Sequence, residues 1–359
     1  MKVMSILGTR PDLIKMSEII KKLDQHTEHV FVHTGQNHDY ELNGVFYGDL
    51  GLRKPDHFLN AAGDSLGQTL GKLMRKIEQV LEAEKPDAVV ILGDTNSALS
   101  SIIVKRRKIP LFHLEAGNRC FDDNVPEEVN RRIIDHISDV NLTFSENARR
   151  YLLAEGLPKD RTFLMGSPMH EVLSKHLTEI EQSTILDQLE LDKYYLFSVH
   201  RDENVEMNFA GVIDAVNALA EVTDSTVVMP LHPRTRQKLE GVSIHRNILT
   251  TVPFGFLDYC KLQTSAACVI SDSGTLAEES ALLNFPAVTI RNAIERPEAM
   301  DAGTLIMCRP DAASLMEAIS VASAPNAIPK DYLVENCSDR VLKIILSYTS
   351  YVQRYVWHV

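Results

Sequence analysis

Three acidic positions in this sequence are of a type and spacing that could transfer protons. They are Asp94, Glu115 and the Pro126-Glu127-Glu128 step, which opens a predicted helix. Carboxylates gathered in one place repel an anionic ligand, so their clustering favours chemistry over plain binding. Asp94 could equally be a helix cap, because aspartate is a favoured capping residue.

A second group of residues could bind a phosphorylated ligand. Ser273-Gly274-Thr275 follows a predicted strand and opens a predicted helix, whose first backbone amides could bind an anion. Glu279, one turn further, could accept hydrogen bonds from ribose hydroxyls or could be a solvated helix carboxylate. Arg10 and Lys15 could supply positive charge to a diphosphate, although Lys15 could also belong to an exposed charged helix face.

The histidines and cysteines predict no metal site. The 13 histidines include no HExxH motif, and the five cysteines are far apart, with no CxxC pair to build a zinc cage or a disulfide framework. We expect His113 to be packed in its strand rather than catalytic. His232, which precedes a proline, could be a core histidine or could contact phosphate, while His200 follows another predicted strand and Asp272 could be a second helix cap.

Short apolar runs alternate with helical patterns along most of the chain, which is typical of a parallel sheet covered by helices. Leu66, Leu70, Leu73, Ile77 and Leu81 have the spacing of one helix face. The predicted strands are Val3–Leu7, Val30–His33, Ala88–Leu92, Pro110–Leu114, Val140–Phe144, Tyr194–Val199, Thr226–Leu231, Cys268–Ser271 and Ala287–Ile290. Ligands of open parallel sheets bind beyond the carboxyl ends of strands, and seven of about nine predicted strand ends present glycine, a charge or a histidine.

The length of 359 residues exceeds what one hydrophobic core usually fills, so we expect two α/β domains with a cleft between them. The alternation pauses near Gly166-Ser167-Pro168 and then restarts. We place a first Rossmann-like domain at 1–168 and a second at 169–337, with a helix over 338–359 that completes the first.

Composition excludes two classes of partner. With 44% hydrophobic and 24% charged residues and no apolar run near the roughly 20 residues that cross a bilayer, we expect no membrane insertion. A formal charge of −12 argues against nucleic-acid binding, which needs a basic surface. The first segment, Met1 to Leu7, has no secretory cleavage signature, so we expect a cytoplasmic protein.

The residues at the strand ends resemble, in order from residue 8 to residue 304, the motifs of the non-hydrolysing UDP-N-acetylglucosamine 2-epimerases. These motifs are Gly8-Thr9-Arg10-Pro11, Thr34-Gly35-Gln36, Gly93-Asp94-Thr95, Glu115-Ala116-Gly117, Pro126-Glu127-Glu128 with Asn130-Arg131, His200-Arg201, Ser271-Asp272-Ser273-Gly274 with Glu278-Glu279, and Arg296-Pro297-Glu298 with Ala302-Gly303-Thr304. The resemblance implies a glycosyltransferase-B architecture, a UDP-sugar substrate in the cleft between the two domains, commonly a homodimer, and no cofactor.

The same resemblance implies the roles of individual residues. The family's reaction breaks the C1–O bond to UDP, removes the C2 proton to give a 2-acetamidoglycal, and adds UDP back after protonation of the other face. Asp94, Glu115 and Glu127 are implied to transfer protons and to stabilise positive charge, without an assignment of each to a face of C2. Lys15 and His200 are implied to assist departure of the diphosphate. The UDP-sugar is implied to be held by Arg10, Arg131, His232, Ser273, Gly274 and Glu279.

Several segments resemble one branch of the family, which makes UDP-N-acetyl-L-fucosamine for capsule or O-antigen from the corresponding L-talose derivative. These segments are His33–Asn37, Asp39–Asn43, Arg53–Asp56, Asn60–Gly63 and Gly117–Asp122. Gln36-Asn37 and Val199–Glu203 depart from the usual forms of the regions that build an effector site in the glucosamine enzymes. The alternatives are UDP-N-acetylglucosamine as substrate, a hydrolysing epimerase, a retaining glycosyltransferase and a non-catalytic nucleotide-sugar sensor.

Overall fold

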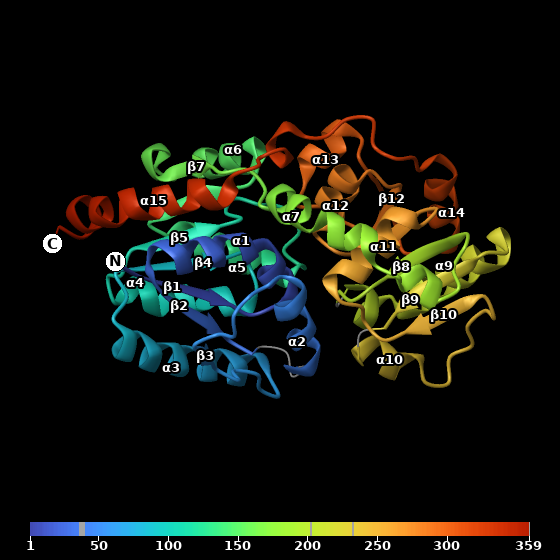
Figure 1. Cartoon of the computed structure of the whole chain (residues 1–359), viewed down its shortest axis with the longest axis horizontal. Coiled ribbons are helices and arrows are strands. Elements are labelled where there is room, and N and C mark those ends of the chain that lie inside the picture. Colours follow the sequence, from blue (N-terminus) through green and yellow to red (C-terminus); the bar gives the residue numbers. More distant parts are fainter. Residues whose placement is uncertain (36–39, 202, 232, 359) are drawn as a thin grey trace. The chain divides into compact units, whose positions relative to one another are not determined.

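The structure is a computed structural model that describes the chain except for residues 36–39, 202, 232 and 359. It divides into two compact units, the first made of Met1–Ser174 with Asp331–Val359 and the second of Lys175–Lys330 (Figure 1). After the second unit, the chain returns to the first unit at Asp331, seven residues before the predicted start of the C-terminal helix at residue 338. The reason is that Asp331 accepts hydrogen bonds from the amides of Glu146 and Ser167, at 2.8 and 3.0 Å.

The first unit is built on a seven-stranded parallel sheet with the order β3-β2-β1-β4-β5-β6-β7. Its strands are β1 (Lys2–Leu7), β2 (Glu28–His33), β3 (His57–Phe58), β4 (Ala88–Leu92), β5 (Leu111–Leu114), β6 (Val140–Thr143) and β7 (Thr162–Leu164). On one face, apolar side chains of the strands form a core with helices α3 (Leu66–Glu84), α4 (Ser101–Arg106) and α5 (Pro126–Ile137).

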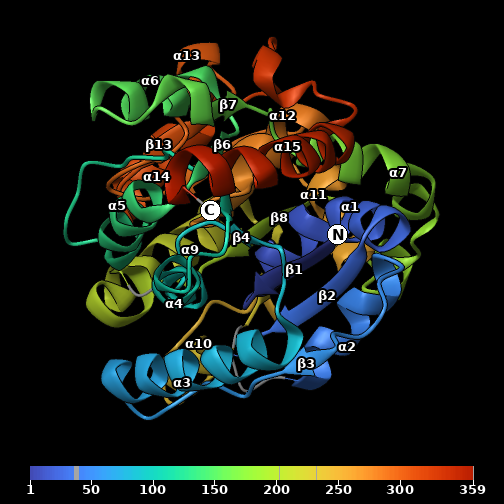
Figure 2. The same ribbon diagram turned by 90° about the vertical axis from the view of Figure 1, so that its left-hand side faces the viewer.

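The other face of this sheet carries α1 (Arg10–His26), and α1 in turn contacts α15 (Cys337–Val352) (Figures 1 and 2). Val341 and Ile345 of α15 are fully buried, and Lys22 and Asp339 form an ion pair between α1 and α15 at 2.9 Å. Helix α15 therefore packs on the first unit, and it ends at Val352, before the end of the predicted segment 338–359. The remaining helices of this unit are α2 (Tyr40–Asp49), α6 (Glu146–Ala154) and the first turns of α7 (Met169–Gln182).

The second unit repeats the design with a six-stranded parallel sheet of order β10-β9-β8-β11-β12-β13. Its strands are β8 (Tyr194–Ser198), β9 (Thr226–Pro230), β10 (Ile248–Thr251), β11 (Val269–Ser271), β12 (Ala287–Ile290) and β13 (Ile306–Cys308). Helices α9 (Phe209–Thr223) and α14 (Ala312–Val321) pack on one face. The other face is covered by α8 (Ile185–Gln188), α11 (Phe256–Ser265), α12 (Leu276–Leu283) and α13 (Pro297–Ala302).

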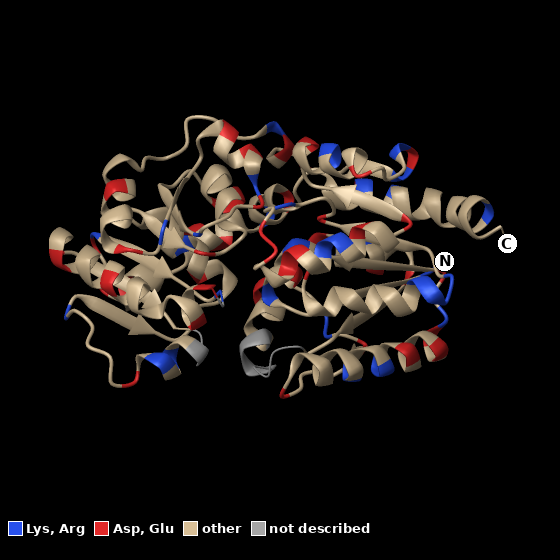
Figure 3. Cartoon of the chain, turned by 180° about the vertical axis from the view of Figure 1, so that it is seen from behind, with Lys and Arg blue, Asp and Glu red and all other residues tan. Residues whose placement is uncertain are grey.

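In both sheets the strand order reverses once, between β1 and β4 in the first and between β8 and β11 in the second. Helices that leave the two strands at such a reversal go to opposite faces and open a crevice at the carboxyl ends, where ligands bind in open α/β sheets. Lys and Arg residues are intermixed with Asp and Glu residues along the ribbon of both units (Figure 3). No helix in the described part of the chain is long and apolar enough to cross a membrane.

Candidate active site

The candidate residues of the first unit lie where the first sheet reverses. Gly8-Thr9-Arg10 follows β1, Gly93-Asp94 follows β4, and Glu115 follows the next strand, β5. Parallel pairing brings the ends of these three strands to the same edge, because β4 pairs with β1 on one side and with β5 on the other. The sheet thus gathers residues that are about 100 positions apart in the sequence.

Lys15 and Glu115 form a buried ion pair at this edge. Lys15 comes from the second turn of α1 and is 5% exposed, and its Nζ donates to Glu115 Oε2. Asn118 Nδ2 donates to the other carboxylate oxygen of Glu115 at 3.3 Å. Burial of an ammonium and a carboxylate costs several kcal/mol per ion unless the two neutralise each other. The alternative of an exposed charged helix face for Lys15 was therefore wrong.

The backbone at Glu115 is held in an unusual conformation. Glu115 has a φ of +63°, in the left-handed region that costs a non-glycine residue roughly 1–2 kcal/mol. Gly117, two residues later, has a φ of +83°, and a Cβ there would lie 2.4 Å from the carbonyl oxygen of Ala148. Because such strain persists only where neighbours fix it, the turn after β5 is a tightly constrained platform for the Glu115 side chain.

Asp94 is held by Arg131 and does not cap a helix. Arg131 Nε and Nη2 both donate to Asp94 Oδ2, at 3.0 and 2.6 Å, and Asn130 Nδ2 donates to the Asp94 carbonyl oxygen at 2.9 Å. The guanidinium also donates to Glu128 Oε2 at 3.1 Å. Arg131 therefore links the turn after β4 to helix α5.

The two glutamates that open α5 differ in environment. Glu127 is partly exposed, whereas Glu128 is fully buried and accepts hydrogen bonds from Arg131, Arg132 and the Cys120 amide. Burial alone would raise the pKa of Glu128, but the Cys120 amide and the two arginines outweigh it and hold the pKa below its usual value. The geometry gives Glu128 a structural task and leaves Glu127 as the glutamate that faces solvent.

The turn after β1 is fixed by Asp12. Its Oδ2 accepts hydrogen bonds from the amides of Gly8 and Thr9, at 3.1 and 3.0 Å, and burial raises the pKa of Asp12 to about 6. A Cβ at Gly8 would lie 1.8 Å from Ser97 Oγ, so only glycine allows this approach to the segment after β4. Arg10, the first residue of α1, places its guanidinium 5.8 Å from the ring centre of Phe46.

In the second unit, Asp272 organises the turn after β8. This fully buried aspartate accepts hydrogen bonds from the amides of His200 and Arg201, at 3.1 and 2.9 Å, and from Asn204 Nδ2 at 3.0 Å. His200 Nδ1 lies 3.1 Å from Asp272 Oδ1, while the His200 side chain is 43% exposed. A histidine whose Nδ1 faces a carboxylate presents Nε2 to a ligand. Asp272 is thus not a helix cap.

Ser273 and Gly274 lie between β11 and helix α12 at the same reversal of the second sheet. Ser273 Oγ is 3.0 Å from Thr275 Oγ1, and the Ser273 amide donates to Ser271 Oγ at 3.1 Å. Glu279, on α12, is 5% exposed and accepts a hydrogen bond from Gln263 Nε2 at 2.6 Å. Glu279 is therefore not the solvated helix carboxylate that was its alternative interpretation.

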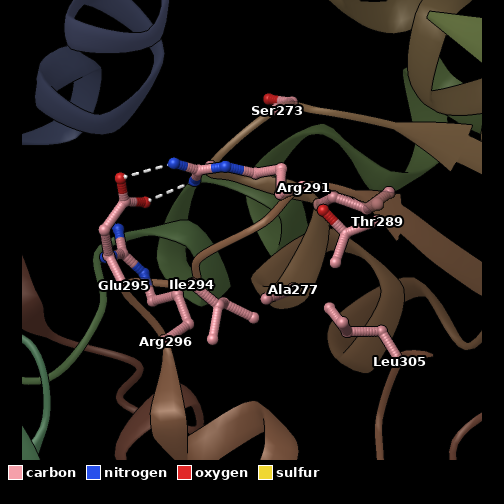
Figure 4. A pocket seen from close by; sticks show the side chains of 10 residues that line it. Ser273, Ala277, Thr289, Arg291, Ile294, Glu295, Arg296 and Leu305 are labelled. Carbon is pink, nitrogen blue, oxygen red and sulfur yellow. Dashed lines mark hydrogen bonds and ion pairs between the residues drawn. The ribbon is translucent and has the colours of Figure 1, made fainter. Parts of the chain in front are cut away.

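A small pocket lies beside the Ser273-Gly274 turn (Figure 4). Arg291 and Glu295, two buried residues of its lining, form an ion pair through two hydrogen bonds of 2.8 and 3.0 Å, and Arg201 Nη1 lies 3.6 Å from Glu295 Oε1. Its apolar lining consists of Leu276, Ala277, Ile294 and Leu305. Arg201 therefore joins three loops of this unit, because its Nε also donates to the Asp272 carbonyl oxygen at 3.0 Å.

The structure brings the predicted residues together as two groups, one in each unit. In the first it pairs Lys15 with Glu115 and Asp94 with Arg131, and in the second it places His200, Ser273, Gly274 and Glu279 on the reversal edge. His232 and Gln36-Asn37 lie outside the described residues. The sequence did not reveal the residues that fix the candidate side chains and their turns through hydrogen bonds and ion pairs. These are Asp12, Glu128, Asp135, Asn204, Gln263 and Glu295.

No group of three or more histidine, cysteine, aspartate or glutamate side chains in the described part of the chain is arranged to hold a metal ion. The described cysteines form no disulfide, and burial raises the pKa of the Cys120 thiol to about 11. The functional groups of the candidate site, among the described residues, are carboxylates, cationic side chains, one histidine and backbone amides.

Residues 21–346 match the protein family described as UDP-N-acetylglucosamine 2-epimerase. A structure of UDP-N-acetylglucosamine 2-epimerase from Rickettsia bellii is 47% identical, with 100% of both chains covered and a TM-score of 0.94. The Methanocaldococcus jannaschii UDP-GlcNAc 2-epimerase, in complex with UDP-GlcNAc and UDP, is 30% identical, with 97% of this chain and 100% of the other covered and a TM-score of 0.88.

Two further similarities bear on activity and fold. A UDP-2,3-diacetamido-2,3-dideoxy-D-glucuronate 2-epimerase of Pseudomonas aeruginosa is 31% identical over 314 residues, which are 86% of this chain and 88% of that protein. A glycotransferase of kitacinnamycin shares the fold at 9% identity, with a TM-score of 0.55 and 95% and 98% of the two chains covered. The predicted α/β fold, two Rossmann-like parallel-sheet units of the glycosyltransferase-B type, is confirmed.

The contrast between Glu127 and Glu128 is testable by stability. Glu128→Gln should lower the free energy of unfolding by about 3 kcal/mol or more, because it removes the buried charge that faces Arg131. Glu127→Gln, the matched control, should change it by less than about 1 kcal/mol, because its side chain is partly exposed. Urea unfolding followed by circular dichroism measures both, and equal losses would contradict the assignment.

Proposed function

This chain belongs to the UDP-N-acetylglucosamine 2-epimerase family and is an isomerase, and we propose that it inverts C2 of UDP-2-acetamido-2,6-dideoxy-L-talose to give UDP-N-acetyl-L-fucosamine. The observation that carries the catalytic part of this proposal is the pairing of buried Glu115 and half-buried Asp94 with cations at the reversal of the first sheet. Lys15 lies beside Glu115 and Arg131 beside Asp94, so carboxylates and positive charge share one edge of the sheet, which supports a proton-transfer site there.

The chemistry of C2 explains why a nucleotide is needed. This carbon has no adjacent carbonyl group, so its proton is not acidic enough for simple removal and return. When the C1–O bond breaks, its electron pair leaves with UDP and positive charge develops at C1. Loss of the C2 proton then forms the C1=C2 bond of a 2-acetamidoglycal, and protonation of the other face with return of UDP gives the epimer.

In this reaction the first unit supplies acids and bases. Asp94, Glu115 and Glu127 transfer the C2 proton and stabilise the developing positive charge, as carboxylates do for an oxocarbenium-like state. Glu115 is the best-supported member, because its strained backbone and its bonds to Lys15 and Asn118 fix the carboxylate in place. The neighbouring cations Lys15 and Arg10 assist the leaving diphosphate.

The second unit supplies groups that hold UDP. His200, oriented by buried Asp272, donates a hydrogen bond to the diphosphate as it leaves. The backbone amides around Ser273 and Gly274 bind phosphate oxygens, and Glu279, positioned by Gln263, accepts hydrogen bonds from the ribose hydroxyls. His232 is a further candidate for contact with the phosphates of UDP.

The sugar is the finer part of the proposal. Segments such as Arg53–Asp56 and Asn60–Gly63 resemble the L-fucosamine branch, which favours a 6-deoxy sugar and a role in capsule or O-antigen synthesis. The family resemblance favours a homodimer, and a cytoplasmic location stays a prediction. The P. aeruginosa relative is named for a diacetamido-glucuronate substrate, so members of this family differ in the sugar they accept. The names of most relatives support UDP-N-acetylglucosamine, which would give UDP-N-acetylmannosamine, as the alternative substrate.

Turnover in deuterated water should place deuterium at C2 of the product, because the proton that is removed exchanges with solvent. Mass spectrometry of the isolated UDP-sugar measures this incorporation.

Asp94→Asn should lower turnover by at least about 100-fold if Asp94 transfers a proton. Asp64→Asn, a control at an exposed carboxylate of the same unit, should leave turnover unchanged.

Product that carries no solvent deuterium would exclude the elimination route. Near-normal turnover of Asp94→Asn would remove Asp94 from the proton-transfer group. A glycosyltransferase would need an acceptor and would leave C2 unlabelled, and a hydrolysing epimerase would release free sugar.

The choice of sugar is tested by incubation with UDP-2-acetamido-2,6-dideoxy-L-talose and, separately, with UDP-N-acetylglucosamine. We expect faster inversion of the L-talose derivative, followed by the change in the C1 and C2 proton couplings in NMR spectra. Conversion of the glucosamine substrate alone would overturn the branch assignment while leaving the 2-epimerase activity intact.

A further inference from the structure

His113 is a buried histidine between the two turns that carry Asp94 and Glu115. It lies in β5, two residues before Glu115, and it is fully buried. Its Nε2 donates to the carbonyl oxygen of Gly93 at 2.8 Å, since a carbonyl oxygen can only accept. His113 therefore holds the residue that directly precedes Asp94.

Asp135 of helix α5 lies on the other side of His113 and is also fully buried. Its Oδ1 is 2.9 Å from His113 Nδ1, close enough for an ion pair although not aligned for a hydrogen bond. Its two carboxylate oxygens also accept from the Gly117 amide, at 3.2 Å each, and Oδ2 accepts from Arg119 Nη1 at 2.7 Å. Asp135 therefore fixes the turn that directly follows Glu115.

Together the two side chains connect three elements. Glu115 has a φ of +63°, which a non-glycine residue keeps only where its surroundings hold it, while Gly93 has a φ of +69° that glycine adopts readily. His113 fixes the first turn and Asp135 the second, and the same helix α5 carries Arg131, which holds the Asp94 carboxylate. A shift of either buried residue would move Asp94 relative to Glu115.

We propose that His113 and Asp135 are positioning residues that set the separation of Asp94 and Glu115. The inference rests on the proposed function, in which a proton leaves one face of C2 and another arrives on the opposite face. Two groups that act on opposite faces of one carbon must be held at fixed positions, and a displacement of about 1 Å can cost about 100-fold in rate. Neither positioning residue contacts the sugar in this account.

A second buried histidine of the same unit provides a matched control. His29 Nδ1 lies 2.6 Å from Asp24 Oδ1, and its Nε2 is 2.9 Å from Ser5 Oγ. His29 is at the beginning of β2, so it lies toward the amino ends of the strands, opposite the edge that carries the candidate site. Its loss should affect stability without moving Asp94 or Glu115.

The test compares His113→Gln with His113→Asn, because each amide replaces one ring nitrogen. Glutamine reaches the position of Nε2 and keeps a donor for Gly93, whereas asparagine reaches only the position of Nδ1. We expect His113→Asn to lower kcat by about 100-fold and His113→Gln by less than about 10-fold. KM and the Kd for UDP should stay within about threefold for both, and His29→Gln should keep the wild-type kcat.

Equal kcat values for the two His113 variants, after correction for the folded fraction, would overturn the inference, as would parallel changes of kcat and KM. If His113→Asn does not fold, Asp135→Asn replaces it, since the amide keeps an acceptor for Gly117. A loss of kcat of at least about 10-fold at unchanged KM supports the inference, and an unchanged kcat contradicts it. A wild-type protein that inverts C2 of neither UDP-sugar would instead refute the proposed function.

Discussion

Buried carboxylates are stable only when cations or hydrogen-bond donors accompany them, and this constraint shapes the first unit. Glu115 faces Lys15, Asp135 faces Arg119, and Glu128 faces Arg131, which also binds the half-buried Asp94. Removal of one partner from such a pair is costly, because the charge that remains is buried without compensation. The contacts that neutralise these carboxylates therefore also fix their positions, and a site for proton transfer needs that precision.

The two sheets explain why these groups occur where they do. Each sheet is parallel throughout and reverses its strand order once, at β1 and β4 in the first unit and at β8 and β11 in the second. The residues at those reversals differ in chemistry, with paired carboxylates in the first unit and a histidine, a Ser-Gly turn and buried Glu279 in the second. The same architecture thus carries carboxylate–cation pairs in one unit and, in the other, a histidine and backbone amides of the kind that bind phosphate.

Local patterns predicted the buried centre of each sheet and missed the edges. All nine predicted strands exist, whereas the four missed strands, β3, β7, β10 and β13, are the outermost ones. Edge strands are short and half exposed, so they lack the continuous apolar run that identifies a central strand. Strand-end residues such as Asp94 and Glu115 were predictable, because each follows its own strand. Their partners were not, since Lys15 is 100 residues from Glu115 and nothing local in the sequence separates buried Glu128 from Glu127.

The central claim is that UDP leaves and returns during inversion of C2. The most direct measurement supplies the enzyme with UDP and the 2-acetamidoglycal of its own substrate, in the absence of any UDP-sugar, and follows the products by NMR. The account predicts that both C2 epimers of the UDP-sugar form, because addition of UDP to the glycal is the second half of the reaction. An enzyme that inverts C2 of the intact UDP-sugar but makes neither epimer from UDP and the glycal would contradict the account.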